Sequence, residues 1–170
     1  MKKYVIYKGF HYAFFLIGRL FGWSWNKKKF KIRFKFDERA WWTPPRNYDD
    51  YDLNKLAGKS FGGIHKNSVI LTWEPDFDIE GVMDIYGYTY DSSINTHTAK
   101  YLCSVSCDIE QAAILELHDD VYYFALNGRF LQMENKTKDC KLQKNCFPFH
   151  GGNNTAPNTY NIWTKIEAMA

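Results

Sequence analysis

The chain has 170 residues and a formal net charge of +3; 45% of its residues are hydrophobic and 24% are charged. This composition is typical of folded proteins and excludes a disordered or collagen-like chain, and the length fits one domain. The aromatic content of 18% supplies many large side chains for a core. No apolar run approaches the roughly 20 residues that a membrane-crossing helix needs, so we expect no membrane span.

The charge is unevenly distributed along the chain. Residues 1–36 carry ten basic side chains and no acidic one, and the remaining residues sum to −7. This asymmetry favours an anionic partner, which could be an acidic glycan, a nucleic acid or the acidic face of a neighbouring subunit. The alternative is a solvated strand edge on which lysines prevent aggregation. The apolar stretch at residues 12–17 is too short for a signal peptide, so we expect no leader.

Alternation of apolar and polar residues dominates the pattern. Residues 30–36 alternate Phe or Ile with Lys or Arg, which predicts a half-buried strand with a basic outer face. Further strands are expected at residues 3–8, 68–73, 83–90, 100–106, 114–118, 122–126, 129–134 and 160–166. Asn127-Gly128 predicts a tight hairpin between two of them, and residues 53–56 are expected to form one helical turn. The fold class is therefore all-β, a single antiparallel β-sandwich of the jelly-roll, concanavalin A-like type.

Two parts are expected within this domain. Residues 1–28 form a basic, aromatic N-terminal arm or strand, and residues 29–170 form the sandwich. The basic and aromatic side chains around the junction are the candidate docking residues: Trp23, Trp25, Lys27, Lys28 and Lys29. Such aromatics most often pack in a core or subunit interface, and the alternatives are stacking on a sugar ring or, less often, on a nucleic-acid base. No other nucleic-acid motif is present, so a nucleic-acid partner is not expected.

The cysteines and acidic residues do not match a known metal pattern. Cys103, Cys107, Cys140 and Cys146 permit three disulfide pairings, but without a leader we expect reduced thiols. Their spacings differ from the Cys-x2-Cys pairs of structural zinc sites. Residues 76–81, Asp-Phe-Asp-Ile-Glu-Gly, resemble the start of a calcium loop, but the twelfth position is a glycine. We expect no cofactor or metal, with a looser calcium site on this loop as the alternative.

Three segments carry a family resemblance. Residues 114–129 consist of a strand, a polar turn, an aromatic strand and Asn-Gly, and they resemble laminin-G and other concanavalin A-like sandwiches. The tail at 147–157, Phe-Pro-Phe-His-Gly-Gly-Asn-Asn-Thr-Ala-Pro, and the tetrapeptide His65-Lys66-Asn67-Ser68 are similar to small jelly-roll proteins of gut Bacteroidota and their phages. The resemblance covers most of residues 29–167. It implies a bacteriophage virion component, a capsid decoration or fibre-associated protein found in the host cytoplasm during assembly and then in the virion.

Alginate-lyase-type polysaccharide lyases share that fold, and their motifs are only partly present. Their Gln-Ile/Val-His triplet corresponds to Gly63-Ile64-His65, which keeps the histidine and lacks the glutamine. Their late Tyr-Phe-Lys-Ala-Gly-x-Tyr motif falls on residues 148–154, with Asn154 in place of the final tyrosine, and their Arg-x-Glu-Leu-Arg motif has no match. If the chain is a lyase, the resemblance implies His65 as a catalytic residue, and we add Arg39 and Tyr86 as candidate partners.

The leading interpretation is a non-catalytic binding or structural module. Its partners are expected to be protein subunits of a larger assembly and an acidic polysaccharide. The alternative is a polysaccharide lyase-like enzyme that acts on an acidic glycan. The candidate glycan-binding residues lie on or near the expected groove: His65, Asn67, His150, Asn153, Asn154, Trp41 and Trp42.

Overall fold

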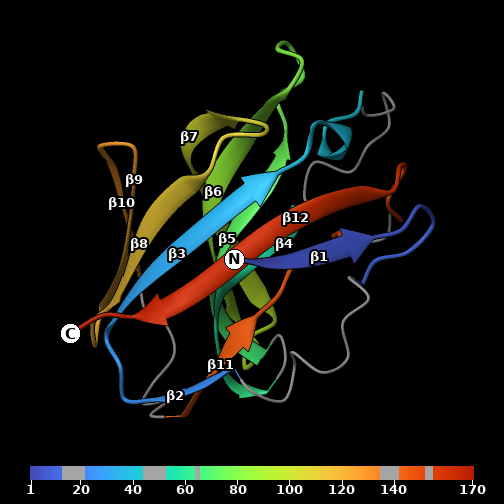
Figure 1. The fold of residues 1–170 in the computed structure, drawn as a ribbon. Helices are drawn as coiled ribbons and strands as arrows, with labels where there is room; N and C mark the ends of the chain where they lie inside the picture. Colours follow the sequence, from blue (N-terminus) through green and yellow to red (C-terminus); the bar gives the residue numbers. More distant parts are fainter. Residues whose placement is uncertain (13–21, 44–52, 64–65, 135–141, 152–154) are drawn as a thin grey trace.

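A computed structural model describes residues 1–12, 22–43, 53–63, 66–134, 142–151 and 155–170. In this described part of the chain, twelve strands form two six-stranded antiparallel sheets that pack face to face (Figure 1). Sheet A, in spatial order, contains β1 (Lys2–Ile6), β12 (Tyr160–Ala168), β3 (Lys29–Phe36), β8 (Gln111–Leu117), β9 (Val121–Leu126) and β10 (Arg129–Glu134). Sheet B contains β2 (Trp23–Trp25), β11 (Leu142–Cys146), β4 (Asn54–Gly63), β5 (Lys66–Pro75), β6 (Val82–Asp91) and β7 (Thr96–Ser106). The all-β jelly-roll sandwich predicted from the sequence is confirmed.

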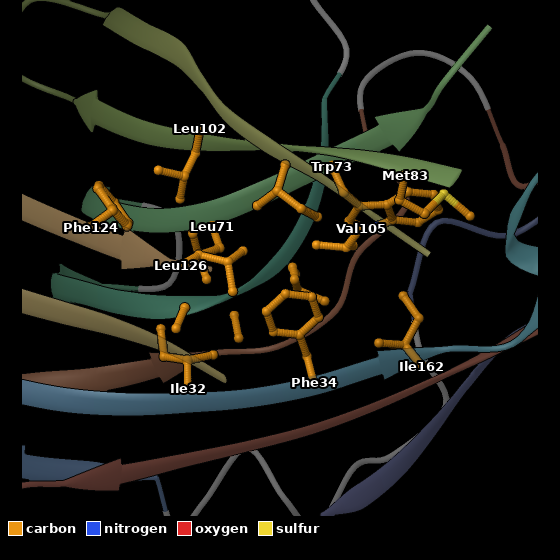
Figure 2. Close-up of a cluster of buried hydrophobic side chains, with 14 of the residues drawn as sticks. Ile32, Phe34, Leu71, Trp73, Met83, Leu102, Val105, Phe124, Leu126 and Ile162 are labelled. Carbon is orange, nitrogen blue, oxygen red and sulfur yellow. The ribbon is translucent and has the colours of Figure 1, made fainter. Parts of the chain in front are cut away.

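The core lies between the two sheets and is filled by alternate residues of each strand. On β3, Phe30, Ile32, Phe34 and Phe36 are buried while the basic residues between them face outward, as the alternation predicts. Figure 2 shows Phe34 of sheet A and aliphatic and aromatic side chains of both sheets meeting in this layer. Burial of this continuous apolar layer is the main stabilising contribution to the fold.

Two glycines are required by the geometry of the fold. Gly87 of β6 faces sheet A, and a Cβ there would lie 2.6 Å from Leu131 and 2.9 Å from Phe124. Any side chain at this position would therefore have to displace the side chains of Leu131 and Phe124. At the β9–β10 hairpin, Asn127 and Gly128 both have positive φ, 50° and 75°, as the predicted Asn-Gly turn demands.

The predicted strands all exist, and three further strands were not anticipated. β4 replaces the helical turn expected at residues 53–56, and that expectation was wrong. Pairing along β5 and burial of Leu56 and Phe61 outweigh the weak local helical preference of so short a segment. β2 and β11 are short, and β11 is mostly polar, so neither produces a clear alternation. Two strands of the expected N-terminal arm (residues 1–28) are members of the sheets, since β1 pairs with β12 and β2 pairs with β11.

Candidate functional site

The outer face of sheet B carries a line of tyrosines along β6. Met83, Ile85 and Gly87 point into the core, so Tyr86 and Tyr88 point outward. Side chains two residues apart on a strand are separated by about 7 Å, so this face presents aromatic rings at regular intervals. The register places Tyr88 opposite Ile70 on one side and Ala99 on the other.

A groove of about 350 Å³ lies on this face and is lined by Tyr12, Lys55, Ser68, Ile70, Tyr88, Tyr90 and Phe149. Its walls come from three parts of the chain that are far apart in sequence. Phe149 exchanges two backbone hydrogen bonds with Lys55, of 2.8 and 2.9 Å, which fixes the segment before His150 onto the start of β4. Tyr12 packs edge-on against Phe149 with ring centroids 4.9 Å apart. Long-range backbone pairing therefore builds the groove.

Lys55 supplies a cation to the groove. Its Nζ lies 5.4 Å from the ring centroid of Tyr88 and 5.9 Å from that of Phe149. Aromatic faces attract ammonium groups, so the two rings hold the charge on the groove wall. The opening thus combines apolar ring surfaces, one positive charge and the hydroxyl groups of Ser68 and the tyrosines.

A polar network lies on the same face, one register step from the groove. Tyr86 donates its hydroxyl proton to Glu74. Burial, and then the adjacent Glu74, raise the pKa of Tyr86 far above its ordinary value. Ser104 donates to Asp84 at 2.6 Å and forms a second hydrogen bond, of 2.8 Å, with Tyr101. The Tyr86 hydroxyl therefore stays protonated at neutral pH and is already committed to an acceptor within the protein.

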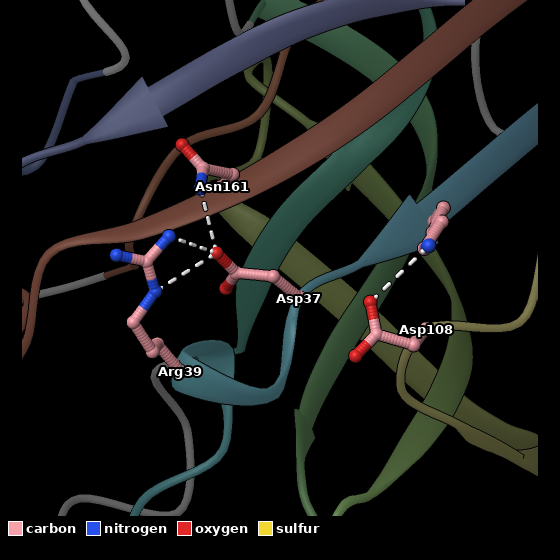
Figure 3. A network of polar contacts seen from close by, with 5 residues as sticks. Asp37, Arg39, Asp108 and Asn161 are labelled. Atoms are coloured by element: carbon pink, nitrogen blue, oxygen red, sulfur yellow. Dashed lines mark hydrogen bonds and ion pairs between the residues drawn. The ribbon is translucent and has the colours of Figure 1, made fainter.

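The candidate lyase residues are not brought together. Arg39 follows β3 and forms a 2.6 Å ion pair with Asp37, which also accepts a 2.6 Å hydrogen bond from Asn161 of β12 (Figure 3). Tyr86 lies on the outer face of sheet B instead. His65 lies outside the described residues. Arg39 and Tyr86 thus belong to separate polar networks on different sheets.

Two of the candidate glycan-binding residues are core residues. Trp42 and His150 are buried, at 6% and 0% exposure, and their rings lie 5.2 Å apart. His150 also forms a 2.8 Å hydrogen bond with Tyr160 through Nδ1. Because neither ring reaches the surface, the structure does not support their expected contact with a ligand. Both rings instead pack in the core against Tyr160 of β12.

The remaining candidates have structural partners or are not described. Trp41 is half-buried and donates its indole N–H to the backbone carbonyl of Asp76 at 3.0 Å. Asn67 has a positive φ of 46°, and its Oδ1 accepts hydrogen bonds from the backbone and hydroxyl of Ser92. Asn67 therefore braces the turn between β6 and β7. Asn153 and Asn154 lie outside the described residues.

The candidate docking residues occupy the edge of sheet B and the start of β3. Trp25 is 66% exposed on the edge strand β2, and Lys27 is exposed in the following turn. Lys28 pairs with Asp119 at 2.7 Å and Lys29 with Glu116 at 2.6 Å. The last two lysines are thus matched by acids of the same chain. Trp23 lies in β2 opposite Lys144.

Sequence reasoning missed most of the groove. It noted the β6 alternation and named Tyr86, but Lys55, Tyr12 and Phe149 meet only through strand pairing across the chain. The alternating tyrosines of β6 were the one available signal. The isolated backbone bridges that join Phe149 to Tyr12 and Lys55 cannot be predicted from a single sequence.

The cysteines and the acidic turn show no metal site in the described part of the chain. No group of three or more His, Cys, Asp or Glu side chains there could hold an ion. Asp76 instead accepts backbone hydrogen bonds from Asp78 and Ile79, of 2.8 and 3.0 Å, which makes the candidate calcium loop a braced turn. Cys103, Cys107 and Cys146 are buried free thiols, and burial raises the pKa of each.

No protein-family model matches the chain, and no curated protein matches it. Several solved structures do. Alginate lyase A1-II', of polysaccharide lyase family 7, matches with a TM-score of 0.56 and 12% identity over 86% of this chain and 64% of the lyase. SCLam, a non-specific endo-β-1,3(4)-glucanase of family GH16, matches with a TM-score of 0.53 and 10% identity over 84% of this chain and 57% of the glucanase.

A second alginate lyase, AlyC3, matches with a TM-score of 0.53 and 6% identity over 86% of this chain and 67% of the lyase. This chain spans less than two thirds of the length of A1-II' and of SCLam. At these identities the likeness shows a shared fold. The chain therefore has the jelly-roll sandwich of alginate-lyase-like proteins, as the motifs indicated. In the part of the chain that the structure describes, no helix has the length and apolar character to cross a membrane.

Proposed function

We propose that this chain is a non-catalytic carbohydrate-binding module whose ligand lies in the groove on the outer face of sheet B. The observation that carries the proposal is the groove itself, in which Tyr12, Tyr88, Tyr90 and Phe149 surround about 350 Å³. That volume is at the lower end of the range for small-ligand sites. The fold neighbours named above, two alginate lyases and a glucanase, support a carbohydrate ligand by analogy.

The groove chemistry suits a sugar. Sugar rings present flat C–H faces and polar edges, and aromatic side chains offer an apolar surface with hydroxyl groups at the rim. Tyr88 and Phe149 are the platform on which a ring would stack. Ser68 also lines the groove. Its hydroxyl would form hydrogen bonds with the polar edge of the sugar.

Lys55 points to an acidic glycan as the ligand. Its ammonium group lies over the two rings that form the platform. A carboxylate or sulfate on a stacked sugar would reach it and form a charge-assisted hydrogen bond, which is stronger than a neutral one. Neutral sugars would use the stacking surface alone.

The polar network beside the groove supports binding rather than catalysis. β-Elimination requires a base, an acid and a group that neutralises the substrate carboxylate, all converging on one sugar. Tyr86 is bonded to Glu74 and its pKa is raised, so it is unsuited to act as a base. Arg39 is paired with Asp37. The lyase alternative therefore rests on His65, which lies outside the described residues.

We also propose, from the resemblance to phage proteins and from the charge asymmetry, that the module belongs to a larger particle such as a virion. The exposed Trp25 and Leu142, at 66% and 45%, face each other in register at the edge of sheet B. With Lys27 beside them, they offer an apolar and basic contact for another protein subunit.

The test is a screen of acidic and neutral oligosaccharides, followed by calorimetric titration of the glycan that binds. Replacing Tyr88 by Ala should weaken binding about tenfold or more, because stacked aromatic anchors dominate such sites. Lys55→Met should weaken binding of acidic glycans and leave neutral ones unchanged. Tyr123→Ala is the matched control, since Tyr123 is an exposed tyrosine on sheet A.

Equal binding by Tyr88→Ala and the wild type would exclude the groove as the site. The same samples should be followed for the ultraviolet absorbance of an unsaturated sugar product. Its appearance would replace the binding module with the lyase alternative.

A further inference from the structure

The outer face of sheet A is basic. β3 points Lys29, Lys31, Arg33 and Lys35 outward. Two neighbouring strands add cations in register: Lys3 on β1 lies opposite Trp163, and Lys165 on β12 lies opposite Arg33. Only two carboxylates, Glu116 and Glu167, lie on these strands opposite the β3 cations. Within the described residues this face therefore carries more positive than negative charge.

Not every cation on this face is matched. Lys165 pairs with Glu167 at 2.7 Å and Lys29 with Glu116 at 2.6 Å. Lys3 and Lys31 form no ion pair with any described residue. The Lys3 ammonium lies 5.6 Å from the ring centroid of Trp163. These two lysines leave net positive charge available to a partner.

An apolar row crosses the same face. Ile114 of β8 pairs with Ala125 of β9, which pairs with Phe130 of β10. Phe130 is 81% exposed. Lys31 lies next in this row, opposite Ile114. The face thus combines an exposed aromatic ring and aliphatic side chains with a lysine that forms no ion pair with a described residue, although Glu167 lies opposite it.

The turn between β5 and β6 has the opposite charge and also exposes apolar side chains. Phe77 and Ile79 are 53% and 55% exposed and alternate with Asp78 and Glu80. The side chain of Asp76 braces the turn by accepting two backbone hydrogen bonds. The acidic turn (residues 76–81) is therefore a preorganised protrusion with two apolar side chains and at least two outward carboxylates.

The acidic turn and the basic face are neighbours on one molecule. The next turn, between β7 and β8, carries Asp108 and Glu110, which pair with Lys35 and Arg33 of the basic face (Figure 3 shows the Asp108 contact). A 2.8 Å backbone hydrogen bond from Cys107 to Gly81 links this turn to the acidic turn. Two complementary patches that share a border can meet twice across a two-fold axis, which is the commonest symmetry of homo-oligomers.

We propose that two copies of this chain associate about a two-fold axis, with the acidic turn of each copy docked on the basic face of the other. Asp78 and Glu80 would then meet Lys3 and Lys31, and Phe77 would pack near Ile114, which lies opposite Lys31. A second copy is the occupant that matches both patches at once, since each patch is the complement of the other in charge and both expose apolar groups. The groove lies on the outer face of sheet B, the sheet that packs against sheet A (Figure 1), so this contact leaves the groove uncovered.

Sedimentation equilibrium of the full chain tests this dimer. We expect a reversible monomer–dimer equilibrium that weakens as salt rises, because the contact depends on exposed charges. The acidic-turn variant, Asp78→Lys with Glu80→Lys, and the basic-face variant, Lys3→Glu with Lys31→Glu, should each weaken association about tenfold or more through like-charge contacts.

Mixing the two variants separates this proposal from others. In a two-fold dimer, a mixed pair restores both contacts: one is wild-type and the other has both charges reversed. The mixture should therefore dimerise while each variant alone stays monomeric, and circular dichroism should show that both variants are folded. Larger species in the mixture would overturn the two-fold arrangement. A wild-type chain that stays monomeric at low salt would overturn the dimer, and retention on heparin lost in the basic-face variant would then assign the face to a polyanion.

Discussion

Two basic side chains, Lys59 and His150, are buried along strand β4, and they differ in their protonation state at neutral pH. Lys59, at 2% exposure, donates hydrogen bonds to Ser24 and Asn145 and lies 4.1 Å from the ring centroid of Phe30. His150, at 0%, lies beside the other end of β4. One of its ring nitrogens forms a hydrogen bond with Tyr160, and the other is buried without a hydrogen-bond partner among the described residues.

The groups that surround Lys59 and His150 determine which of the two side chains is protonated at neutral pH. Burial lowers the pKa of Lys59 from 10.5 to about 8, so two neutral acceptors and a ring face are enough to keep it mostly protonated at neutral pH. Burial, with a smaller effect of His11, lowers the pKa of His150 from 6.5 to about 4, so its ring is neutral. A buried base therefore keeps its proton only where acceptors replace the water that it has lost.

The largest expected effect comes from reversing the charge at Lys59. In Lys59→Glu a carboxylate would lie against the negative face of Phe30 without a described cation nearby. We expect a loss of about 3–5 kcal/mol in the free energy of unfolding, the usual cost of an uncompensated buried charge. Urea denaturation at neutral pH measures it.

Lys59→Met is the matched control for this reversal. It keeps most of the side-chain length, removes the buried charge and loses two hydrogen bonds, so its loss of stability should be clearly smaller than that of Lys59→Glu. If the two variants are equally stable, Lys59 is not confined between the sheets, and the comparison with His150 fails.

The pH dependence of Lys59 is the next largest effect. Between pH 8 and 10.5 the unfolded chain binds more protons at this residue than the folded chain, so stability rises with pH. The free energy of unfolding should gain about 2–3 kcal/mol from Lys59 between about pH 7 and 10. Burial also raises the pKa values of Tyr4 and Cys146 to about 12, which lowers stability over part of this range.

The difference between the wild type and Lys59→Met isolates the lysine from these other groups. Unfolding of both proteins should be measured at each pH. A difference that does not change with pH would show that Lys59 titrates in the folded chain as it does in the unfolded one.

These two bases also show what a single sequence can predict. Lys59 lies in a segment without clear alternation, Lys-Leu-Ala-Gly-Lys-Ser-Phe, where no local signal indicates an inward lysine. Its burial depends on Ser24 and Asn145, which pairing brings from strands 35 and 86 residues away. The sandwich itself was predictable because residues 30–36 and the Asn127-Gly128 turn encode strand period and hairpin locally.

The sequence predicted the kind of site, a glycan-binding groove, but not the residues that line the groove in the structure. His150 and Trp42 stand in polar or aromatic segments typical of ligand contacts, yet both are buried. Phe149 lies next to His150 and lines the proposed groove, so the sequence analysis named the residue beside the one that faces this groove. Which of two consecutive residues faces solvent depends on the backbone pairing with Lys55, which the sequence does not reveal.

The smallest of these effects is the acid sensitivity contributed by His150. Between pH 6.5 and 4, His150 is mostly protonated in the unfolded chain and mostly neutral in the folded chain. The free energy of unfolding therefore falls as pH falls through this window. At about pH 5 the loss from His150 should be about 2 kcal/mol relative to neutral pH. His150→Gln keeps a hydrogen-bonding partner for Tyr160 and cannot titrate. Its stability should therefore fall less than that of the wild type between pH 7 and 5, as urea unfolding at each pH would show. Equal slopes for the two proteins would mean that the folded chain accommodates a charged ring at this position, and that His150, like Lys59, has acceptors to replace water.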